Sequence, residues 1–233
     1  LADAEEVIFS SPYTLYTPEN YTKVWSQEGA DEMIFEYLQT DVYNAQRYAP
    51  GYYTSPLGYS EYGVSEVFYN WLNLNPLDVR SKMVANCMTA PDSEPDYHVG
   101  YYPLKYPGNA GASVQTYTNN IKVIRLSEVY LIAAESALNE GADAAVYLNA
   151  LRANRIEGYS DVEAVSMEDI IDERRKELFG EGQIAFDFWR TGRTVDNGSF
   201  VIDPTDFRTV LPLPIEEIDL SKGKLVQNPG YGN

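Results

Sequence analysis

The stretch D-E-R-R-K-E-L-F-G-E-G-Q-I-A-F-D-F-W-R-T-G-R, residues 172–193, places ten charged residues among bulky apolar ones. The segment S-M-E-D, which begins at Ser166, is typical of a capping box at the start of a helix. We expect this helix to continue through the quoted stretch. On it, one stripe with the spacing of a buried face contains Met167, Ile171, Arg174 and Leu178.

The arginine on this stripe indicates what the helix is for. Removing an ion from water costs several kcal/mol unless the ion is paired and hydrogen-bonded, so we expect Arg174 to be buried and neutralised. Glu177 lies one helical turn away, and Glu181 follows a turn later. The sequence therefore predicts a structural ion-pair network rather than an active site. Its expected members are Arg125, Glu128, Glu173, Arg174, Arg175, Glu177 and Glu181.

Residues that usually carry catalysis are scarce. The single histidine, His98, lies in a loop rich in Pro and Tyr and is expected on the surface. The single cysteine, Cys87, is expected to be buried, and it allows neither an internal disulfide nor a multi-cysteine zinc site. No nucleophile-elbow, zinc-protease or phosphate-loop motif is present. We expect no enzyme activity, no metal site and no cofactor, and no motif supports a Ca²⁺ site.

The charge of the chain excludes several kinds of partner. Thirty-five acidic and seventeen basic residues give a net charge of −18, which would repel the phosphates of nucleic acid and bare anionic lipid. No apolar run approaches the length of about 18 residues that a membrane-spanning helix needs. The chain starts without Met, in what looks like the middle of a helix, so we expect a mature or truncated product.

We expect one domain, 1–233, of mainly α fold class and with three regions. Residues 1–120 hold most of the twenty tyrosines and many turn-forming residues, which predicts a loop-rich region. Short helices are expected there near residues 1–9 and 20–26, and a strand or a helix edge at 32–39. Residues 121–193 predict a helical bundle. Residues 194–233 predict an extended tail in which I-E-E-I makes one helical turn.

The helical region contains the pattern of a tetratricopeptide-like hairpin. Ser127 is expected to cap a helix that runs to Asn139, Gly141 suits its left-handed end, and Asp143 is expected to cap a second helix. Because the turn is so short, the two helices must lie antiparallel. Small residues for close packing are Ala133, Ala134 and Ala137. One such pair cannot bury its own faces alone.

Three segments in a fixed order resemble the C-terminal half of the SusD/RagB family. They are I-R-L-S-E-V-Y-L-I-A-A-E-S-A, then D-E-R-R-K-E-L-F-G-E-G-Q-I-A-F-D-F-W-R-T-G, then L-P-L-P-I-E-E-I followed by Q-N-P-G-Y. The segment E-M-I-F-E-Y-L-Q, residues 32–39, also resembles the family. The resemblance covers this whole chain but only about half of a typical member, so the N-terminal half is expected to be absent.

The resemblance implies a nutrient-binding lipoprotein on the cell surface, at the outer membrane. Such a protein caps a SusC-like TonB-dependent transporter and delivers glycans, or in some members peptides, to it without catalysis. The lipid anchor would be an N-terminal cysteine in the half that is not present here. Expected partners are therefore the transporter, a glycan ligand and the missing N-terminal half, with no nucleic acid.

Aromatic residues crowd the segment 43–71 among Gly, Pro and Ser. Aromatic rings on loops offer flat faces to the C–H side of sugar rings, and this density predicts the ligand site. The expected ligand-binding residues are Tyr48, Tyr52, Tyr53, Tyr59, Tyr62, Tyr69 and Trp71, with Tyr43 in the same segment. A second cluster, expected to be structural, contains Tyr97, Tyr101, Tyr102 and Tyr106.

Three other functions are compatible with the sequence. The same fold could bind peptides, for which tyrosine-rich loops serve equally well. The chain could be an interaction scaffold in which the aromatic side chains are all buried. A glycoside hydrolase is the least favoured of the three, and it would need two carboxyl groups facing each other across a cleft.

Overall fold

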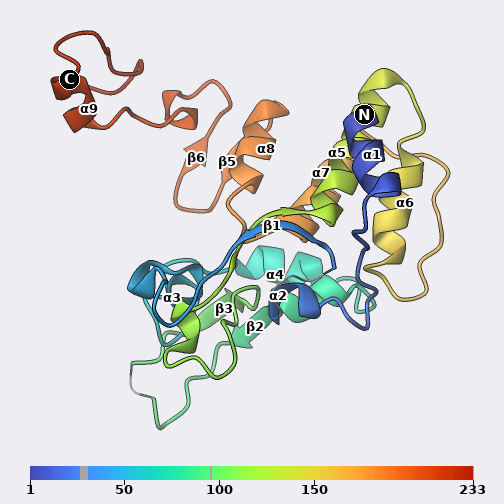
Figure 1. Ribbon diagram of the computed structural model, residues 1–233, viewed down its shortest axis with the longest axis horizontal. Coiled ribbons are helices and arrows are strands. Elements are labelled where there is room, and N and C mark those ends of the chain that lie inside the picture. Colours follow the sequence, from blue (N-terminus) through green and yellow to red (C-terminus); the bar gives the residue numbers. More distant parts are fainter. Residues whose placement is uncertain (27–30, 95, 233) are drawn as a thin grey trace. The chain divides into compact units, whose positions relative to one another are not determined.

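The computed structural model describes residues 1–26, 31–94 and 96–232, and it divides the chain into two compact units, Leu1–Gly180 and Glu181–Asn233 (Figure 1). The second unit begins earlier than the tail that the sequence predicted to start at Thr194. The mainly α fold class is confirmed, since the strands are few and short. The α-helices are α1 (Ala2–Ser10), α2 (Lys23–Ser26), α3 (Pro50–Tyr53), α4 (Glu66–Leu72), α5 (Leu126–Glu140), α6 (Ala145–Ala153), α7 (Met167–Leu178), α8 (Ile184–Arg190) and α9 (Ile215–Leu220).

The strands form three antiparallel pairs in the described part of the chain. These are β1 (Met33–Tyr37) with β4 (Ile121–Arg125), β2 (Val84–Cys87) with β3 (Gly100–Pro103), and β5 (Val195–Asp196) with β6 (Val201–Ile202). The segment 32–39, for which the sequence allowed a strand or a helix edge, thus contains the strand β1 at Met33–Tyr37. Short 3-10 helices are η1 (Gln46–Tyr48), η2 (Val79–Met83), η3 (Gln115–Tyr117) and η4 (Phe207–Thr209).

Helix α5 is the centre of the helical bundle and contacts α1, α6 and α7. Its small residues Ala133, Ala134 and Ala137 are completely buried, which allows the close approach of α6. Gly141 ends the helix in the left-handed conformation, at φ 72°, where a side chain would be strained. The predicted hairpin of α5 and α6 is therefore present.

The predicted helix starts are correct in one case and wrong in another. The Ser166 hydroxyl and the Asp169 carboxylate form a reciprocal capping box at the start of α7. Ser127, however, does not cap α5. That helix begins at Leu126, and the buried Ser127 hydroxyl accepts a hydrogen bond from Arg125 instead. Asp143 lies one residue before the cap position of α6 and accepts a bond from the backbone N–H of Ala145 at 3.0 Å.

The prediction of one helix through residues 172–193 is wrong. Helix α7 ends at Leu178, and Phe179 takes an extended ψ of 141°. Gly180 and Gly182 follow at φ 74° and 84°, in the left-handed region that glycine adopts without steric cost. Two such residues close together interrupt the helix, and α8 starts separately at Ile184.

The hydrophobic core of the first unit joins its loop-rich part to the end of α7. Its buried residues are Tyr21, Val24, Trp25, Met33, Phe68, Leu72, Val79, Met83, Val84 and Phe179. They come from α2, β1, α4, η2 and β2, except that Tyr21 lies in the turn before α2 and Phe179 follows α7 directly. Long connecting loops are therefore fixed at several points to one packed centre.

The second unit contains α8, the β5–β6 pair, η4 and α9. The tail predicted to be extended is in part regular, and the expected single turn at I-E-E-I is the six-residue helix α9. The Gln227 side chain bonds both the backbone N–H and the carbonyl of Leu213, at 2.8 and 2.9 Å. These bonds hold the end of the chain against the L-P-L-P segment.

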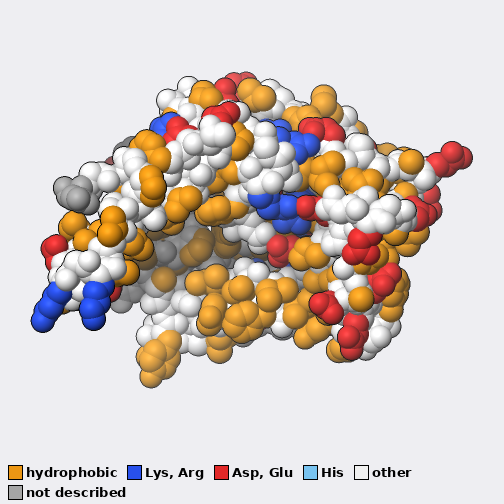
Figure 2. Space-filling view, turned by 90° about the horizontal axis from the view of Figure 1, so that it is seen from above, with side chains coloured by type: hydrophobic (Ala, Val, Ile, Leu, Met, Phe, Trp, Pro, Cys, Tyr) orange, Lys and Arg blue, Asp and Glu red, His pale blue; other side chains and the backbone are white. Residues whose placement is uncertain are grey.

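Acidic side chains gather on part of the surface. They lie at the right-hand end of Figure 2, the end where Figure 1 shows α1 and α6. Exposed acidic residues of this region are Asp3, Glu6, Glu140, Asp143, Glu157, Asp161 and Glu163.

Among the helices of the described residues, none has both the length and the apolar character needed to cross a membrane.

Candidate functional site: a tyrosine face on a buried charge network

Glu177 on α7 lies at the centre of the buried charges. Its carboxylate contacts the guanidinium groups of Arg125 at 2.5 Å, Arg155 at 3.0 Å and Arg80 at 3.2 Å. Its backbone carbonyl accepts a bond from Lys105 Nζ at 2.7 Å. The side chain of Glu177 is completely buried, so one carboxylate helps to neutralise three arginines that come from separate parts of the chain.

Further carboxylates complete this arrangement. Glu173 pairs with Arg80 at 2.5 Å and with Arg152 at 2.6 Å, and Glu32 pairs with Arg155 at 2.6 Å. Asp78 pairs with Arg80 at 2.7 Å, so four carboxylates contact four guanidinium groups. Pairing of this kind offsets the cost of taking the charges out of water. We call this the buried charge network; its members are Glu32, Asp78, Glu173, Glu177, Arg80, Arg125, Arg152 and Arg155.

The structure brings together only part of the network that the sequence predicted. Arg125, Glu173 and Glu177 belong to it. Arg174 is buried, as expected, and pairs with Glu128, another predicted member, at 3.8 Å.

Two more predicted members lie elsewhere. The guanidinium group of Arg175 lies over the rings of Phe68 and Trp71, at 5.3 and 4.9 Å. Glu181 is not on α7, because the helix ends before it, and it opens the second unit.

Burial and charge act in opposite directions on the two central carboxylates. Burial raises the pKa of Glu177, but Arg155, Arg125 and Arg80 together hold this pKa well below its usual range. For Glu173, burial again raises the pKa, and Arg80 and Arg152 lower it by more. Both groups are therefore ionised in the folded protein at neutral pH.

This gives the stability a defined pH dependence. The pKa values of Glu173 and Glu177 are lower in the folded protein than in the unfolded chain, where a glutamate has a pKa of about 4.3, so their ionisation stabilises the fold at neutral pH. This contribution shrinks as the pH falls below the unfolded pKa and is lost once the pH has passed through the folded-state pKa. We expect Glu173→Gln to lower the free energy of unfolding by about 3 kcal/mol at pH 7. Urea unfolding at a series of pH values should show the difference from wild type shrinking below about pH 4. A difference that stays constant down to pH 3 would contradict this assignment.

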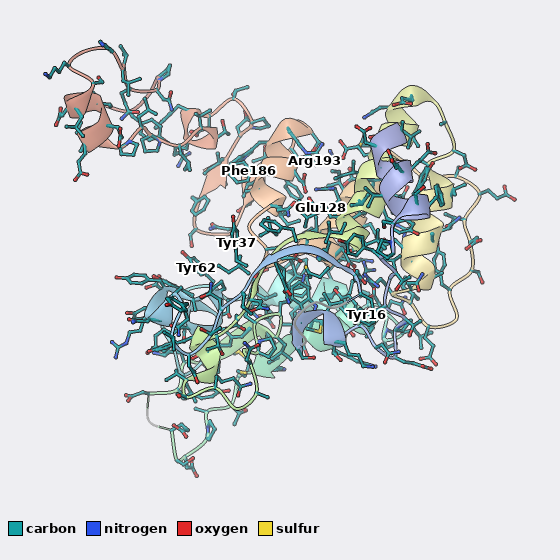
Figure 3. All side chains as sticks on the ribbon, viewed as in Figure 1. Tyr16, Tyr37, Tyr62, Glu128, Phe186 and Arg193 are labelled. Carbon is teal, nitrogen blue, oxygen red and sulfur yellow. The ribbon has the colours of Figure 1, made fainter. Side chains whose placement is uncertain are left out.

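A group of tyrosine side chains from three neighbouring segments lies on the surface. Tyr52 contacts Tyr59 at 4.9 Å and Tyr117 at 5.5 Å between ring centroids, and Tyr53 contacts Tyr59 and Tyr62, each at 5.2 Å. We call these five rings the tyrosine platform. Tyr59 and Tyr62 are exposed, and Tyr62 extends from the loop near α3 (Figure 3). An accessible cluster of rings at these spacings can stack against a flat ligand.

The backbone explains why these rings meet. Tyr52 and Tyr53 lie on α3, and the loop that follows folds back on it, with Tyr59 N–H bonded to Tyr52 O at 3.0 Å and Tyr62 N–H bonded to Tyr53 O at 3.2 Å. Helix η3, which carries Tyr117, also contacts α3. Tyr117 was not among the ligand-binding residues predicted from sequence, because it stands apart from the segment 43–71 in which aromatic residues crowd.

The other predicted ligand residues are not in ring contact with the platform. Tyr69 stacks on Tyr101 at 4.3 Å, and Trp71 contacts Phe68 at 5.6 Å. Tyr69 and Trp71 are half-buried and pack against the hydrophobic core, as expected of residues on the inner side of α4. Tyr48 is 78 % exposed on η1 next to the platform residues of α3.

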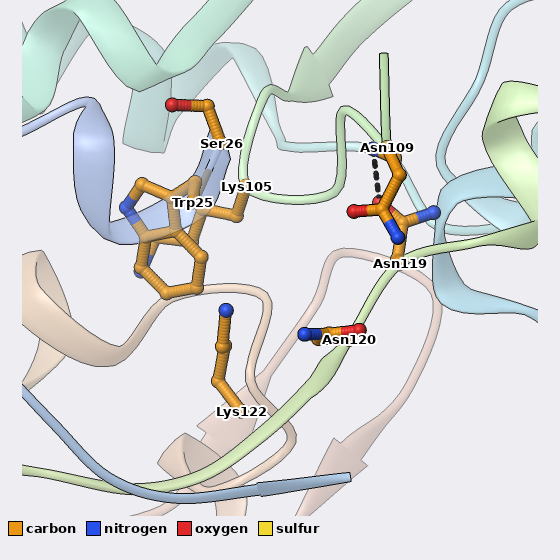
Figure 4. Close-up of a pocket in the computed structure, with 8 residues that line it drawn as sticks. Trp25, Ser26, Lys105, Asn109, Asn119, Asn120 and Lys122 are labelled. Atoms are coloured by element: carbon orange, nitrogen blue, oxygen red, sulfur yellow. Dashed lines mark hydrogen bonds between the residues drawn. The ribbon is translucent and has the colours of Figure 1, made fainter. Parts of the chain in front are cut away.

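Two buried amide side chains, Asn119 and Asn120, lie beside Trp25, Lys105 and Lys122 in the lining of a small pocket (Figure 4). Asn119 Oδ1 accepts a bond from the backbone N–H of Gly108 at 2.6 Å, and its Nδ2 donates to Thr116 O at 3.0 Å. Asn120 Oδ1 accepts from the N–H of Gln39 at 2.9 Å. These bonds fix η3, the loop at Gly108 and the end of β1 to one another.

Gly51 allows α3 to lie against these amides. A Cβ at this position would meet Asn119 Nδ2 at 2.3 Å and Tyr106 O at 2.8 Å, closer than real Cβ contacts. We expect Gly51→Ala to cost roughly 1–3 kcal/mol of unfolding free energy and to displace Tyr52 and Tyr53. Thermal or urea unfolding measures the first effect, and ligand titration the second. Gly232→Ala is the control, because a Cβ there meets nothing within 4 Å; equal effects of the two variants would contradict the assignment.

Other residues singled out in the sequence have plain structural positions. Tyr102 is buried at the β2–β3 pair, and the Tyr106 hydroxyl donates a hydrogen bond to Gly180 O at 2.6 Å. Both positions fit the structural role expected of the cluster that contains Tyr97, Tyr101, Tyr102 and Tyr106.

His98 is exposed, as expected. Cys87 is half-buried at the end of β2 rather than buried, and its hydrogen bond is the main cause that raises the pKa of Tyr97 to about 12. In the described ranges, no three His, Cys, Asp or Glu side chains are grouped as metal ligands.

The model of the SusD family matches residues 86–231, which is more than half of the chain. The chain belongs to the SusD family, and the resemblance drawn from its sequence is confirmed.

Relatives of known structure share this fold. A SusD superfamily protein from Bacteroides thetaiotaomicron is 32% identical, with a TM-score of 0.82 over 98% of this chain and 55% of that one. A putative sugar binding protein from Bacteroides vulgatus is 29% identical, with a TM-score of 0.85 over 100% of this chain and 55% of the other. Surface glycan-binding protein A from Bacteroides thetaiotaomicron, in complex with laminarihexaose, is 27% identical with a TM-score of 0.74, over 97% of this chain and 58% of that one.

Among curated proteins, the starch-binding protein SusD of Bacteroides thetaiotaomicron is 29% identical over 124 residues, which are 48% of this chain and 22% of that protein. The chain spans about half the length of the structural relatives that it matches.

Proposed function

We propose that this chain is the glycan-binding part of a cell-surface protein that captures an oligosaccharide or polysaccharide on the tyrosine platform. The observation that carries the proposal is the accessible cluster of five contacting rings on a rigid support. Relatives named for starch and for laminarihexaose support a carbohydrate as the ligand. The chain would hold the glycan without cleaving it.

The expected affinity is modest. Three or four stacked rings at roughly 1 kcal/mol each, with some hydrogen bonds, must first offset the cost of association. A Kd on the order of millimolar to tens of micromolar follows. Firm capture of a polysaccharide would then depend on several binding events along one polymer.

Delivery to a SusC-like TonB-dependent transporter, and a lipid anchor in the outer membrane, are part of the same proposal. Family membership supports them, as do relatives named as surface glycan-binding proteins. A pull-down from outer membranes with the tagged protein should recover a barrel transporter. Recovery of none would argue against the transporter step and leave glycan binding to be judged separately.

Isothermal titration tests glycan binding directly. Laminarihexaose, maltohexaose and a mixture of tryptic peptides would each be titrated into the chain. We expect heat of binding with at least one glycan. Heat with the peptides only would replace glycans by peptides as the cargo, and release of reducing sugar by the pure protein would contradict binding without catalysis.

A further inference from the structure

Arg47 is an isolated cation beside the tyrosine platform. It is the only basic residue between Thr40 and Val79, in a chain with twice as many acidic as basic residues. It lies exposed on η1. In the ranges that the structure describes, no carboxylate forms an ion pair with it. The platform therefore has one positive charge on its surface that the protein itself does not neutralise.

Helix η1, which carries Arg47, contacts both α3 and η3, where Tyr52 and Tyr117 lie. A hydrogen bond to the Tyr117 side chain is the main cause that raises the pKa of Arg47, with smaller contributions from Tyr52 and from a hydrogen bond to Tyr59. The rings of Tyr59 and Tyr117 each contact the Tyr52 ring that lies between them, at 4.9 and 5.5 Å. The exposed Arg47 side chain therefore lies close to these three tyrosines.

The backbone beside these groups is in an unfavourable conformation. Among the described residues, only three other than glycine have a positive φ, and two of them, Gln46 at 52° and Ser60 at 57°, stand next to Arg47 and Tyr59. Such conformations persist only where surrounding contacts enforce them, and they are concentrated at functional sites. The backbone on either side of this contact is therefore set by the fold, next to both Arg47 and Tyr59.

We propose that Arg47 selects acidic glycans: its guanidinium group binds the carboxylate of a uronic acid whose ring stacks on the adjacent tyrosines. This inference rests on the proposed glycan-binding function and narrows it to a class of sugar. A guanidinium group presents two parallel donors that match a carboxylate, while the sugar ring needs only a flat aromatic face. The two requirements meet at the Tyr52, Tyr59 and Tyr117 edge of the platform.

The surrounding negative charge limits where such a sugar can bind. Glu61 is close enough to Tyr53 to raise its pKa, after the larger effect of burial. The carboxylate is therefore expected at the Arg47 edge, away from Glu61. At physiological salt, charges more than about 8 Å away are largely screened, so the net charge of the whole chain does not prevent binding.

Titration with a matched pair of hexasaccharides tests this. Hexagalacturonate carries a carboxylate on every sugar, and laminarihexaose carries none. We expect Arg47→Gln to weaken hexagalacturonate binding roughly 10- to 100-fold, the usual effect of losing a hydrogen bond to a charged group. Laminarihexaose binding should change by less than about twofold. Arg208→Gln, which removes an exposed arginine of the second unit, should leave both unchanged.

The outcomes separate the two proposals. Loss of hexagalacturonate binding alone, with an unchanged unfolding temperature, supports the role of Arg47. An equal loss for both sugars would mean that Arg47 only orders the tyrosines and would overturn its role in selection. Wild-type protein that binds laminarihexaose but not hexagalacturonate would also overturn the role of Arg47 in selection. If the protein binds neither of these sugars and no other glycan in the panel, the proposed function itself is contradicted.

Discussion

Glu177→Gln is expected to lower the free energy of unfolding by about 3–5 kcal/mol. The change keeps the size of the side chain but removes the charge that Arg80, Arg125 and Arg155 share. Since these guanidinium groups are buried, water cannot replace the lost carboxylate. Single domains are stable by only about 5–15 kcal/mol, so a large part of the total is at stake.

Urea unfolding of the purified chain measures this effect. Glu163→Gln is the matched control, because Glu163 is exposed and its replacement should change the stability by less than about 0.5 kcal/mol. If the glutamine variant at 177 does not fold at all, Arg80→Met tests the same network from the other side and should also be strongly destabilising. A Glu177→Gln variant as stable as the control would show that the network does not hold the fold together.

The double variant Tyr53→Ala, Tyr62→Ala is expected to weaken glycan binding about thirtyfold. Each stacked ring contributes about 1 kcal/mol, and the two rings together about 2 kcal/mol. The two rings stack on each other at 5.2 Å, and Tyr62 is 62 % exposed, so neither belongs to the hydrophobic core. The stability should therefore change little.

Two readouts distinguish binding from structure in this test. Calorimetric titration gives the affinity, and thermal unfolding gives the stability of the same samples. Phe9→Ala removes an exposed ring on α1, at the opposite end of the first unit from α3 in Figure 1, and should leave the affinity unchanged. Unchanged affinity of the double variant with reduced stability would favour the scaffold function that the sequence left open.

Local features of the fold could be predicted from sequence because their causes are local. The capping box at Ser166 depends on residues three positions apart, and Gly141 ends α5 by its own conformational freedom. Two glycines with positive φ, at 180 and 182, were the missed signal for the end of α7. Charged residues with good helical spacing on both sides concealed that break.

The membership of the buried charge network could be predicted only in part. Glu173 and Glu177 stand on a recognisable helix, but Arg80 is 97 residues from Glu177 in the sequence. No periodicity links positions so far apart; only tertiary packing brings them together. The charged face of α7 therefore indicated that arginines would be buried there, and Arg174 is buried as expected, but it did not indicate that Arg80, Arg152 and Arg155 would join Arg125 around Glu173 and Glu177.

The tyrosine site shows the same limit. Aromatic density marked loops whose tyrosines Tyr52, Tyr53, Tyr59 and Tyr62 do meet in the structure, and their role as a ligand site stays a prediction. Density cannot show which face of α4 is covered, so Tyr69 and Trp71 were grouped with the platform although they pack on the core.

The central claim is that a rigidly supported tyrosine platform binds a glycan and leaves it intact. A crystal structure of the chain grown with laminarihexaose, the ligand named for one structural relative, tests it most directly. We predict an uncleaved hexasaccharide with a glucose ring within about 4 Å of the Tyr53 or Tyr62 ring. A hexasaccharide bound away from all five platform rings, or one found cleaved, would contradict the claim.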